Sequence, residues 1–215
     1  MAEVKYYTHR EAAEKFTKLL EGSLGAASSG SWVERLAIAA HDVVAKYPDT
    51  IPSLSVADDS VPQSTNGYYR LEELATHEGA AVRILHWKDG IQTPIHSHEH
   101  LQPIEGNQPQ LKCQLIPLNG TMVETLFERK DEATAVATSA HLLSDKGVVR
   151  QDDSTENNLY IHAITIAGEN TASLHTYSAQ PNTPPKGKRF TDATPDITKK
   201  FVELALQKQP SCRDI

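Results

Sequence analysis

The sequence predicts a mainly β protein with helices at its N-terminus, and three patterns support this prediction. From residue 68 onward the chain falls into short runs in which apolar and polar residues alternate, as they do in half-buried strands. Gly, Pro, Asn and Asp separate these runs, as is typical of turns. The first 48 residues instead place apolar residues at helical spacing. Together these patterns favour an antiparallel sandwich or a small barrel that follows a helical segment.

Helices are expected at both ends of the β region. Within residues 1–48, two capping-box patterns each precede an apolar helical stripe, namely Thr8 with Glu11 and Ser31 with Glu34. Residues 48–67 are rich in Pro, Ser and Asp, and we expect a loop there. A final helix is expected over residues 194–208, with Thr194 as its N-cap and Pro195 at its first position.

Eight strands are expected in the intervening region, residues 66–180, which we take as a β-barrel. Their expected bounds are 68–74, 80–87, 92–98, 111–118, 121–128, 134–143, 159–166 and 172–178. A chain of 215 residues, 39% of them hydrophobic, is long enough for one sizeable core but short for two ordinary domains. We therefore expect a single domain over residues 1–215.

Composition narrows the expected partners and location. A net charge of -7 argues against nucleic-acid and anionic-membrane partners, because both require a basic surface. The two cysteines, Cys113 and Cys212, are too few for a disulfide framework, which favours a reducing compartment. No apolar leader region and no apolar run of roughly 20 residues occurs. We expect a cytoplasmic monomer that acts on small molecules.

Three histidines are the most informative residues. His96 and His98 are two positions apart in an expected strand, so both imidazoles face the same side. With His162 from another strand they could form a metal site that keeps coordination positions open for substrate, as catalytic sites do. The spacing Gly90-x5-His96-x-His98 is similar to the first motif of the cupins, which are small jelly-roll β-barrels. The metal-binding Glu that usually follows in that motif has no good counterpart, since Glu99 would alternate away and Glu105 lies in a Pro/Gly/Asn-rich stretch.

A second polar row lies on the last expected strand. Ser173, His175 and Tyr177 alternate with apolar or small residues and should therefore share one face. Side chains in such a row can orient one another through hydrogen bonds and present the Tyr hydroxyl at the inner end.

At this point the chain resembles the cysteine dioxygenases, iron-dependent thiol dioxygenases of the cupin superfamily. The segments that carry the resemblance are 67–70, 93–98, 118–127, the strand with His162, and 173–178. They cover about residues 66 to 190 and occur in the order that the family shows. The resemblance implies a barrel enzyme that oxidises L-cysteine with O2 to cysteine sulfinic acid, a step of cysteine catabolism.

The resemblance also implies a role for individual residues. It implies that His96, His98 and His162 hold Fe(II). It implies that Arg70 receives the substrate carboxylate, with Tyr68 nearby. It also implies that Ser173, His175 and Tyr177 form the hydrogen-bonded line, with Tyr177 beside the substrate. Cys113 falls where some members carry a cysteine joined to the tyrosine by a thioether bond. Cys113 is therefore either cross-linked to Tyr177 or an ordinary buried thiol.

The chain departs from the family in two places, and several functions stay open. About ten extra residues, 99–110, follow His98, and Ser97 stands where an acidic residue is usual. The substrate could instead be 3-mercaptopropionate, or cysteamine, although Arg70 favours a thiol with a carboxylate. A non-catalytic metal-binding cupin is a further alternative, as is a Zn or Mn isomerase or hydrolase with Glu105 as fourth ligand.

Overall fold

The computed structural model describes residues 67–77, 80–98, 113–143, 150–152, 160–177 and 187–207, together with residues 14, 15, 17–19, 22, 42 and 63. The few described residues of the expected N-terminal helices, 14 to 42, are all helical. The hydroxyl of Thr17 donates to the carbonyl of Leu74 over 3.5 Å. The rest of the expected helices, most of the loop 48–67 and the extra stretch 99–110 lie outside the described residues.

Every expected strand run contains a strand. The strands are β1 (Tyr69–His77), β2 (Ala80–Trp87), β3 (Ile95–Ser97), β4 (Cys113–Asn119), β5 (Met122–Arg129), β6 (Thr134–Leu143), β7 (Arg150–Asp152), β8 (Ile161–Ile166), β9 (Ala172–Tyr177) and β10 (Arg189–Asp192). β7 and β10 were not expected, because three or four residues are too few for alternation to be recognised. The prediction of a mainly β protein with a small barrel is confirmed.

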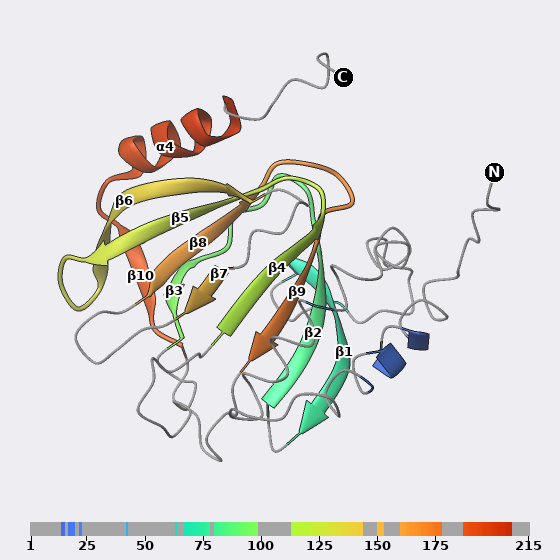
Figure 1. The fold of residues 1–215 in the computed structure, drawn as a ribbon. Helices are drawn as coiled ribbons and strands as arrows, with labels where there is room; N and C mark the ends of the chain where they lie inside the picture. The colour runs from blue at the N-terminus through green and yellow to red at the C-terminus, as the bar shows by residue number, and fades with distance from the viewer. Residues whose placement is uncertain are drawn as a thin grey trace.

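The strands form an open sheet and a closed barrel (Figure 1). The open sheet has the order β1-β2-β9-β4-β7, and all of its pairs are antiparallel. The barrel has the order β10-β3-β8-β5-β6 and closes through a parallel pairing of β10 with β6. The strand with the histidine pair therefore lies between β10, near the end of the chain, and the strand that carries His162.

Two apolar cores occupy the two faces of the barrel strands. All five barrel strands contribute to the first core, inside the barrel: Ile95, Phe127, Ala135, Ile161, Ala163 and Phe190. The second core joins the barrel to the open sheet: Leu85, Trp87, Leu115, Met122, Leu143, Ile164 and Ile166. Because side chains alternate along β8, His162 lies on the same side as Ile164 and faces the open sheet. The candidate site is therefore built between the two layers.

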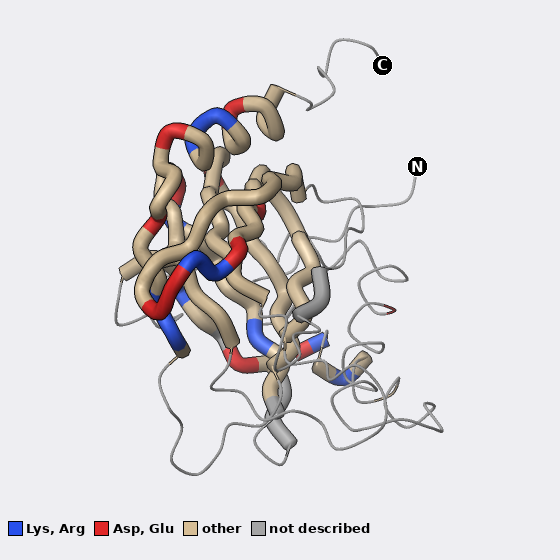
Figure 2. Tube along the Cα trace, turned by 90° about the vertical axis from the view of Figure 1, so that its left-hand side faces the viewer, with Lys and Arg blue, Asp and Glu red and all other residues tan. Residues whose placement is uncertain are grey.

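Helix α4 (Pro195–Gln207) covers the barrel at β5 and β6 (Figure 1) and buries Thr198 and Ala205. Thr194 precedes Pro195 as expected, but its hydroxyl accepts a hydrogen bond from the backbone N–H of Ala137 at 3.0 Å. The helix is thereby tied to β6. α4 and residues 128–132 each carry charges of both signs (Figure 2). No helix among the described residues is long and apolar enough to cross a membrane.

The chain passes between the two layers at a shared corner. β4 leads into β5 through Gly120, and β8 leads into β9 through residues 167–171. The two connections are bonded to each other, from Ala167 N to Thr121 O at 2.9 Å and from the Asn119 side chain to Asn170 O at 3.2 Å. Gly120 has φ +82°, and a Cβ there would lie 2.7 Å from the Cα of Thr171 and also against its hydroxyl. Only glycine fits this corner without displacing backbone.

We predict that Gly120→Ala lowers the free energy of unfolding by about 3 kcal/mol, since a left-handed residue and an overpacked contact each cost of order 1 to 3 kcal/mol. Gly90→Ala is the matched control, because Gly90 has φ +70° but nothing lies within 4 Å of its added Cβ. That variant should lose only about 1 kcal/mol. Urea unfolding measures both, and equal losses would contradict the close approach at Thr171.

Candidate metal centre

The three predicted histidines come together on the face that the barrel turns toward the open sheet. His96 on β3 and His162 on β8 are direct partners across the strand pair, and His98 follows β3 directly. One ligand nitrogen from each ring can be chosen so that all three lie within 4.8 Å of one another. The ring centroids are 4.7 Å apart for His96 and His162, and 5.2 Å apart for the other two pairs. This geometry can hold one metal ion.

Hydrogen bonds behind two of the rings decide which nitrogen faces inward. Nδ1 of His96 lies 2.8 Å from the carbonyl of Pro94, and Nδ1 of His162 lies 2.8 Å from Oε1 of Glu124. A carbonyl and a carboxylate only accept, so each Nδ1 carries the proton. Nε2 is therefore the atom of His96 and of His162 that can serve as a metal ligand.

Nε2 of His162 provides the test of whether the residues suit a metal. This atom is buried and has no hydrogen-bond partner. A buried nitrogen lone pair without a donor costs free energy, and a cation between the three rings would remove that cost. Among the described residues the cluster contains no carboxylate. Glu99 and Glu105, the candidates for a fourth ligand, lie outside the described residues.

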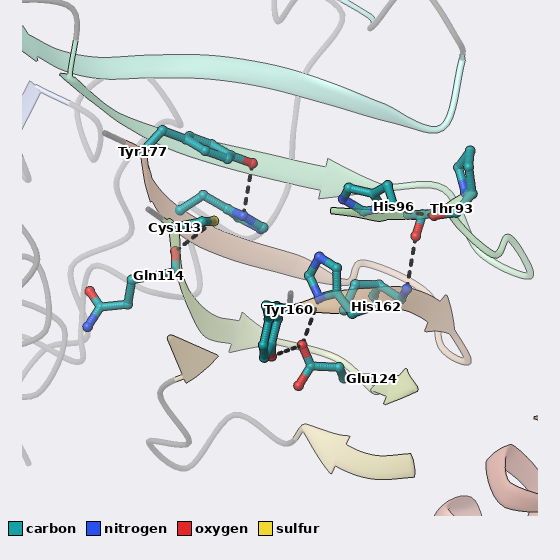
Figure 3. A network of polar contacts seen from close by, with 11 residues as sticks. Thr93, His96, Cys113, Gln114, Glu124, Tyr160, His162 and Tyr177 are labelled. Atoms are coloured by element: carbon teal, nitrogen blue, oxygen red, sulfur yellow. Dashed lines mark hydrogen bonds and ion pairs between the residues drawn. The ribbon is translucent and has the colours of Figure 1, made fainter. Parts of the chain in front are cut away.

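Glu124 and Tyr160 support His162 and were not predicted as site residues. Glu124 is 0% exposed, and its Oε1 accepts from His162 and, at 2.5 Å, from the hydroxyl of Tyr160 (Figure 3). β5 pairs with β8 so that Leu126 is opposite His162, which puts Glu124 on the same face. The sequence offered one signal, a charged Glu124 within an otherwise apolar strand. Its partner His162 becomes evident only from the pairing of β5 with β8.

The predicted row of Ser173, His175 and Tyr177 forms a hydrogen-bonded line. Oγ of Ser173 lies 2.8 Å from Nε2 of His175, and the Tyr177 hydroxyl lies 3.1 Å from Nδ1 of the same ring. The indole N–H of Trp87 also donates to Oγ of Ser173 at 2.7 Å. The line thus begins at Trp87 on β2 and ends at Tyr177 on β9.

Proton positions along this line follow from the buried serine. Ser173 is fully buried, and an indole N–H cannot accept, so the serine proton can go only to Nε2 of His175. The pKa of His175 is lowered to about 3, mainly by burial and further by the nearby His98, His162 and Arg83. The ring is therefore neutral. Its remaining proton is therefore on Nδ1 and is donated to the oxygen of Tyr177. The phenol proton of Tyr177 is then left for another acceptor.

Tyr177 connects the hydrogen-bonded line to the histidine cluster. Its ring centroid is 6.4 Å from that of His98 and 5.6 Å from that of His175. Cys113 on β4 is its direct partner across the strand pair, so thiol and ring lie side by side on one face. Burial raises the pKa of Tyr177 well above its usual value, and Cys113 and Tyr69 raise it further. The phenol therefore stays protonated.

Arg70, the predicted carboxylate receptor, is not brought to this face. Tyr69 is the direct partner of Trp87, whose indole points to Ser173, so Tyr69 faces the site. Arg70 is next in β1 and takes the opposite face, as the partner of His86. Tyr68 lies just before β1, where its carbonyl accepts from the N–H of Lys88 at 3.0 Å. The structure therefore places Tyr69, and not the next residue Arg70, on the face of the site.

Arg83, which sequence reasoning did not single out, lies on the site's face instead. It is the direct partner of His175 across β2 and β9, and its guanidinium carbon lies 5.6 Å from the centroid of the Tyr177 ring. Glu73 on β1 accepts from its Nε at 3.2 Å and from its Nη2 at 3.0 Å. An isolated Arg in a strand gives no sign of this placement, because it depends on the register between β2 and β9.

We predict that Glu124→Gln weakens metal binding by about 10- to 100-fold, because the carboxylate behind a metal-binding His fixes its tautomer and raises its basicity. Competition with a chromophoric chelator measures the affinity. Glu128→Gln is the matched control, an exposed Glu on the same strand, and its affinity should equal that of the parent. Unchanged affinity in Glu124→Gln would show that His162 does not depend on this contact.

No protein-family model matches the chain, and no curated protein matches it. Some solved structures resemble it distantly. DMSP lyase DddQ from Ruegeria pomeroyi DSS-3 has 13% identity and a TM-score of 0.36, covering 89% of this chain and 80% of its own. An RmlC-like cupin protein from Desulfovibrio desulfuricans has 16% identity and a TM-score of 0.29, covering 57% and 96%. Hydroxypropylphosphonic acid epoxidase from S. wedmorenis has 12% identity and a TM-score of 0.32, covering 79% and 96%. None of these likenesses bears on what the chain does.

Proposed function

We propose that the protein is an Fe(II)-dependent thiol dioxygenase of the cupin type that converts L-cysteine and O2 to cysteine sulfinic acid. The observation that carries the proposal is the three-imidazole cluster with the Tyr177 ring 6.4 Å from that of His98, the tyrosine hydroxyl being held by a neutral hydrogen-bonded line. The choice of Fe(II) as the metal and of L-cysteine as the substrate comes from the motifs that resemble the cysteine dioxygenases. Nothing in the reaction needs an external reductant, since both oxygen atoms end on sulfur.

An all-imidazole site suits a thiol substrate because the ligands carry no charge. His96, His98 and His162 would hold a ferrous ion through neutral rings that leave its 2+ charge uncancelled, and such an ion would favour the thiolate form of a thiol substrate. A carboxylate ligand would cancel part of this charge. The chain provides instead a carboxylate, Glu124, that lies behind His162 and contacts its far nitrogen. Glu124 thus tunes the imidazole without itself occupying a coordination position.

Tyr177 is the residue of the chain that we expect to touch the substrate. His175 donates to its oxygen, as argued above, so its own proton points away from the line and can be donated to the substrate or to a developing oxyanion. Trp87 and Ser173 hold His175 in the tautomer that this requires. Because His175 and Ser173 are buried, water does not compete for these bonds.

We also propose a thioether between Cys113 and Tyr177. The two are direct partners on neighbouring strands and face the same side, and the thiol is buried. A bond from Sγ to a ring carbon ortho to the hydroxyl replaces one S–H and one C–H. The two electrons and two protons released are accepted by O2, the oxidant of the proposed reaction. The bond would fix the ring and remove the rotamer entropy that a free tyrosine loses.

The assay for the reaction supplies the Fe(II)-loaded protein with L-cysteine and O2 and measures oxygen uptake together with sulfinate. We expect one sulfinate for each O2 consumed, and loss of turnover in His162→Ala. 3-Mercaptopropionate and cysteamine, tested in parallel, identify the preferred thiol. A loaded protein that binds these thiols but consumes no oxygen with any of them would instead be a non-catalytic metal-binding cupin.

For the thioether, we expect protein isolated after turnover with iron and oxygen to be lighter than the sequence mass by two hydrogen atoms. Intact-mass spectrometry measures this, and peptide mapping should place the link between Cys113 and Tyr177. Cys113→Ser should restore the sequence mass. Tyr177→Phe is a second control, because a ring without the hydroxyl is not activated for the coupling. A parent protein at full mass after many turnovers would remove Cys113 from the mechanism.

A further inference from the structure

We propose that Tyr160 limits the ligand strength of His162 by donating its hydroxyl proton to the same oxygen of Glu124 that accepts from this histidine. The inference rests on the proposed function, since it concerns the iron that the three histidines would hold. Tyr160 is a positioning residue, because it acts through Glu124 and does not touch the substrate. Its expected effect is to favour Fe(II) over Fe(III) at the site.

His162 differs from His96 in the group that lies behind its ring. Nδ1 of His96 contacts the carbonyl of Pro94, which has no net charge, whereas Nδ1 of His162 contacts the carboxylate of Glu124, both at 2.8 Å. A carboxylate draws the Nδ1 proton more strongly than a carbonyl does, so it gives the imidazole more anionic character. A more anionic ligand favours the higher charge of Fe(III). Glu124 alone would therefore make His162 the ligand that stabilises the ferric state.

A single carboxylate oxygen serves two donors. Oε1 of Glu124 accepts from Nδ1 of His162 at 2.8 Å and from the hydroxyl of Tyr160 at 2.5 Å (Figure 3). A length of 2.5 Å is at the short and strong end of hydrogen bonds from a hydroxyl to a carboxylate. Electron density that the oxygen shares with the hydroxyl is not available to the imidazole, so the two donors compete. Tyr160 thus reduces the pull of Glu124 on the His162 proton.

Strand pairing, and not Tyr160 alone, holds Glu124 behind His162. β5, which carries Glu124, pairs with β8 on one side and with β6 on the other, and the Glu124 side chain is 0% exposed. Tyr160 is half-buried and lies just before β8, with its ring 5.0 Å from that of His162 at 58°. Removal of the Tyr160 hydroxyl should therefore leave the contact between Glu124 and His162 in place and strengthen it.

Tyr160 and Tyr177 consequently have separate roles at the cluster. The hydroxyl of Tyr177 receives a hydrogen bond from His175, which leaves its own proton for the substrate. The hydroxyl of Tyr160 donates to Glu124 instead. The proposed reaction begins from Fe(II), so a carboxylate behind a ligand needs a group that moderates it. Tyr160 is that group, and its position two residues before His162 connects it to the ligand whose strength it sets.

The test measures the midpoint potential of the iron-loaded protein by spectroelectrochemistry without any thiol, so that no turnover is needed. We expect Tyr160→Phe to raise the affinity for Fe(III) relative to Fe(II) by about tenfold, which lowers the potential by about 59 mV. The matched control is the same substitution in a Glu124→Gln background. There the ratio should change by less than about twofold, because a neutral amide has no charge for the two donors to share.

Two further measurements distinguish this role from a merely structural one. Tyr160→Phe should bind Zn(II) at least as tightly as the parent in competition with a chromophoric chelator, because the imidazole becomes more basic. Removal of a contact that only supports the fold would weaken this binding. Replacement of tyrosine by 3-fluorotyrosine during expression keeps every side chain and makes the hydroxyl a stronger donor. The potential should then rise in the parent and stay unchanged in Glu124→Gln.

A potential that is unchanged or higher in Tyr160→Phe overturns the proposal, and so does an equal shift in the Glu124→Gln background. Should thermal unfolding show that Tyr160→Phe has lost its fold, the 3-fluorotyrosine protein decides, and an unchanged potential there overturns the proposal. A parent protein that does not bind iron overturns both this proposal and the proposed function. If the potentials shift as expected but the parent forms no sulfinate from any of the thiols, the dioxygenase proposal fails while the role of Tyr160 stands.

Discussion

The register between β3 and β8 is the constraint on which the site depends. His96 is the direct partner of His162, and alternation then brings His98 to the same side. A slip of one residue would turn His162 into the barrel interior and present Ile161 or Ala163 in its place. The ladder from β8 to β5 and the bonds between Thr93 and Ile164, at 2.9 Å in both directions, hold the register. Backbone pairing therefore determines the cluster geometry before any ion is bound.

Charge is arranged in order across the face that the cluster occupies. The outermost groups are the ion pair of Arg83 and Glu73, which is partly exposed. Next come the protonated phenol of Tyr177 and the neutral ring of His175, both held by burial in their uncharged forms. The three imidazoles lie beyond, with Glu124 behind one of them.

Alternation along the sequence was enough to predict eight of the ten described strands, the shared face of His96 and His98, and the line of Ser173, His175 and Tyr177. Each of these is a property of one strand. Residues whose placement depends on how two distant strands pair could not be predicted, and Arg83 and Glu124 are of this kind. Arg70 illustrates the same limit, because its face follows from the pairing of Tyr69 with Trp87, and the sequence around β1 does not indicate which of these two neighbouring residues turns toward the site.

The closure of the barrel has a consequence for how the protein is made. β3 obtains its second neighbour only from β10, through Arg189 opposite His96, and β10 also joins the ring to β6. A nascent chain still attached to the ribosome before residue 192 has emerged would hold the histidine strand along one side only. Metal binding at the three histidines should accordingly be a late, post-translational event that follows closure of the barrel, and the metal should not serve as a nucleus for folding.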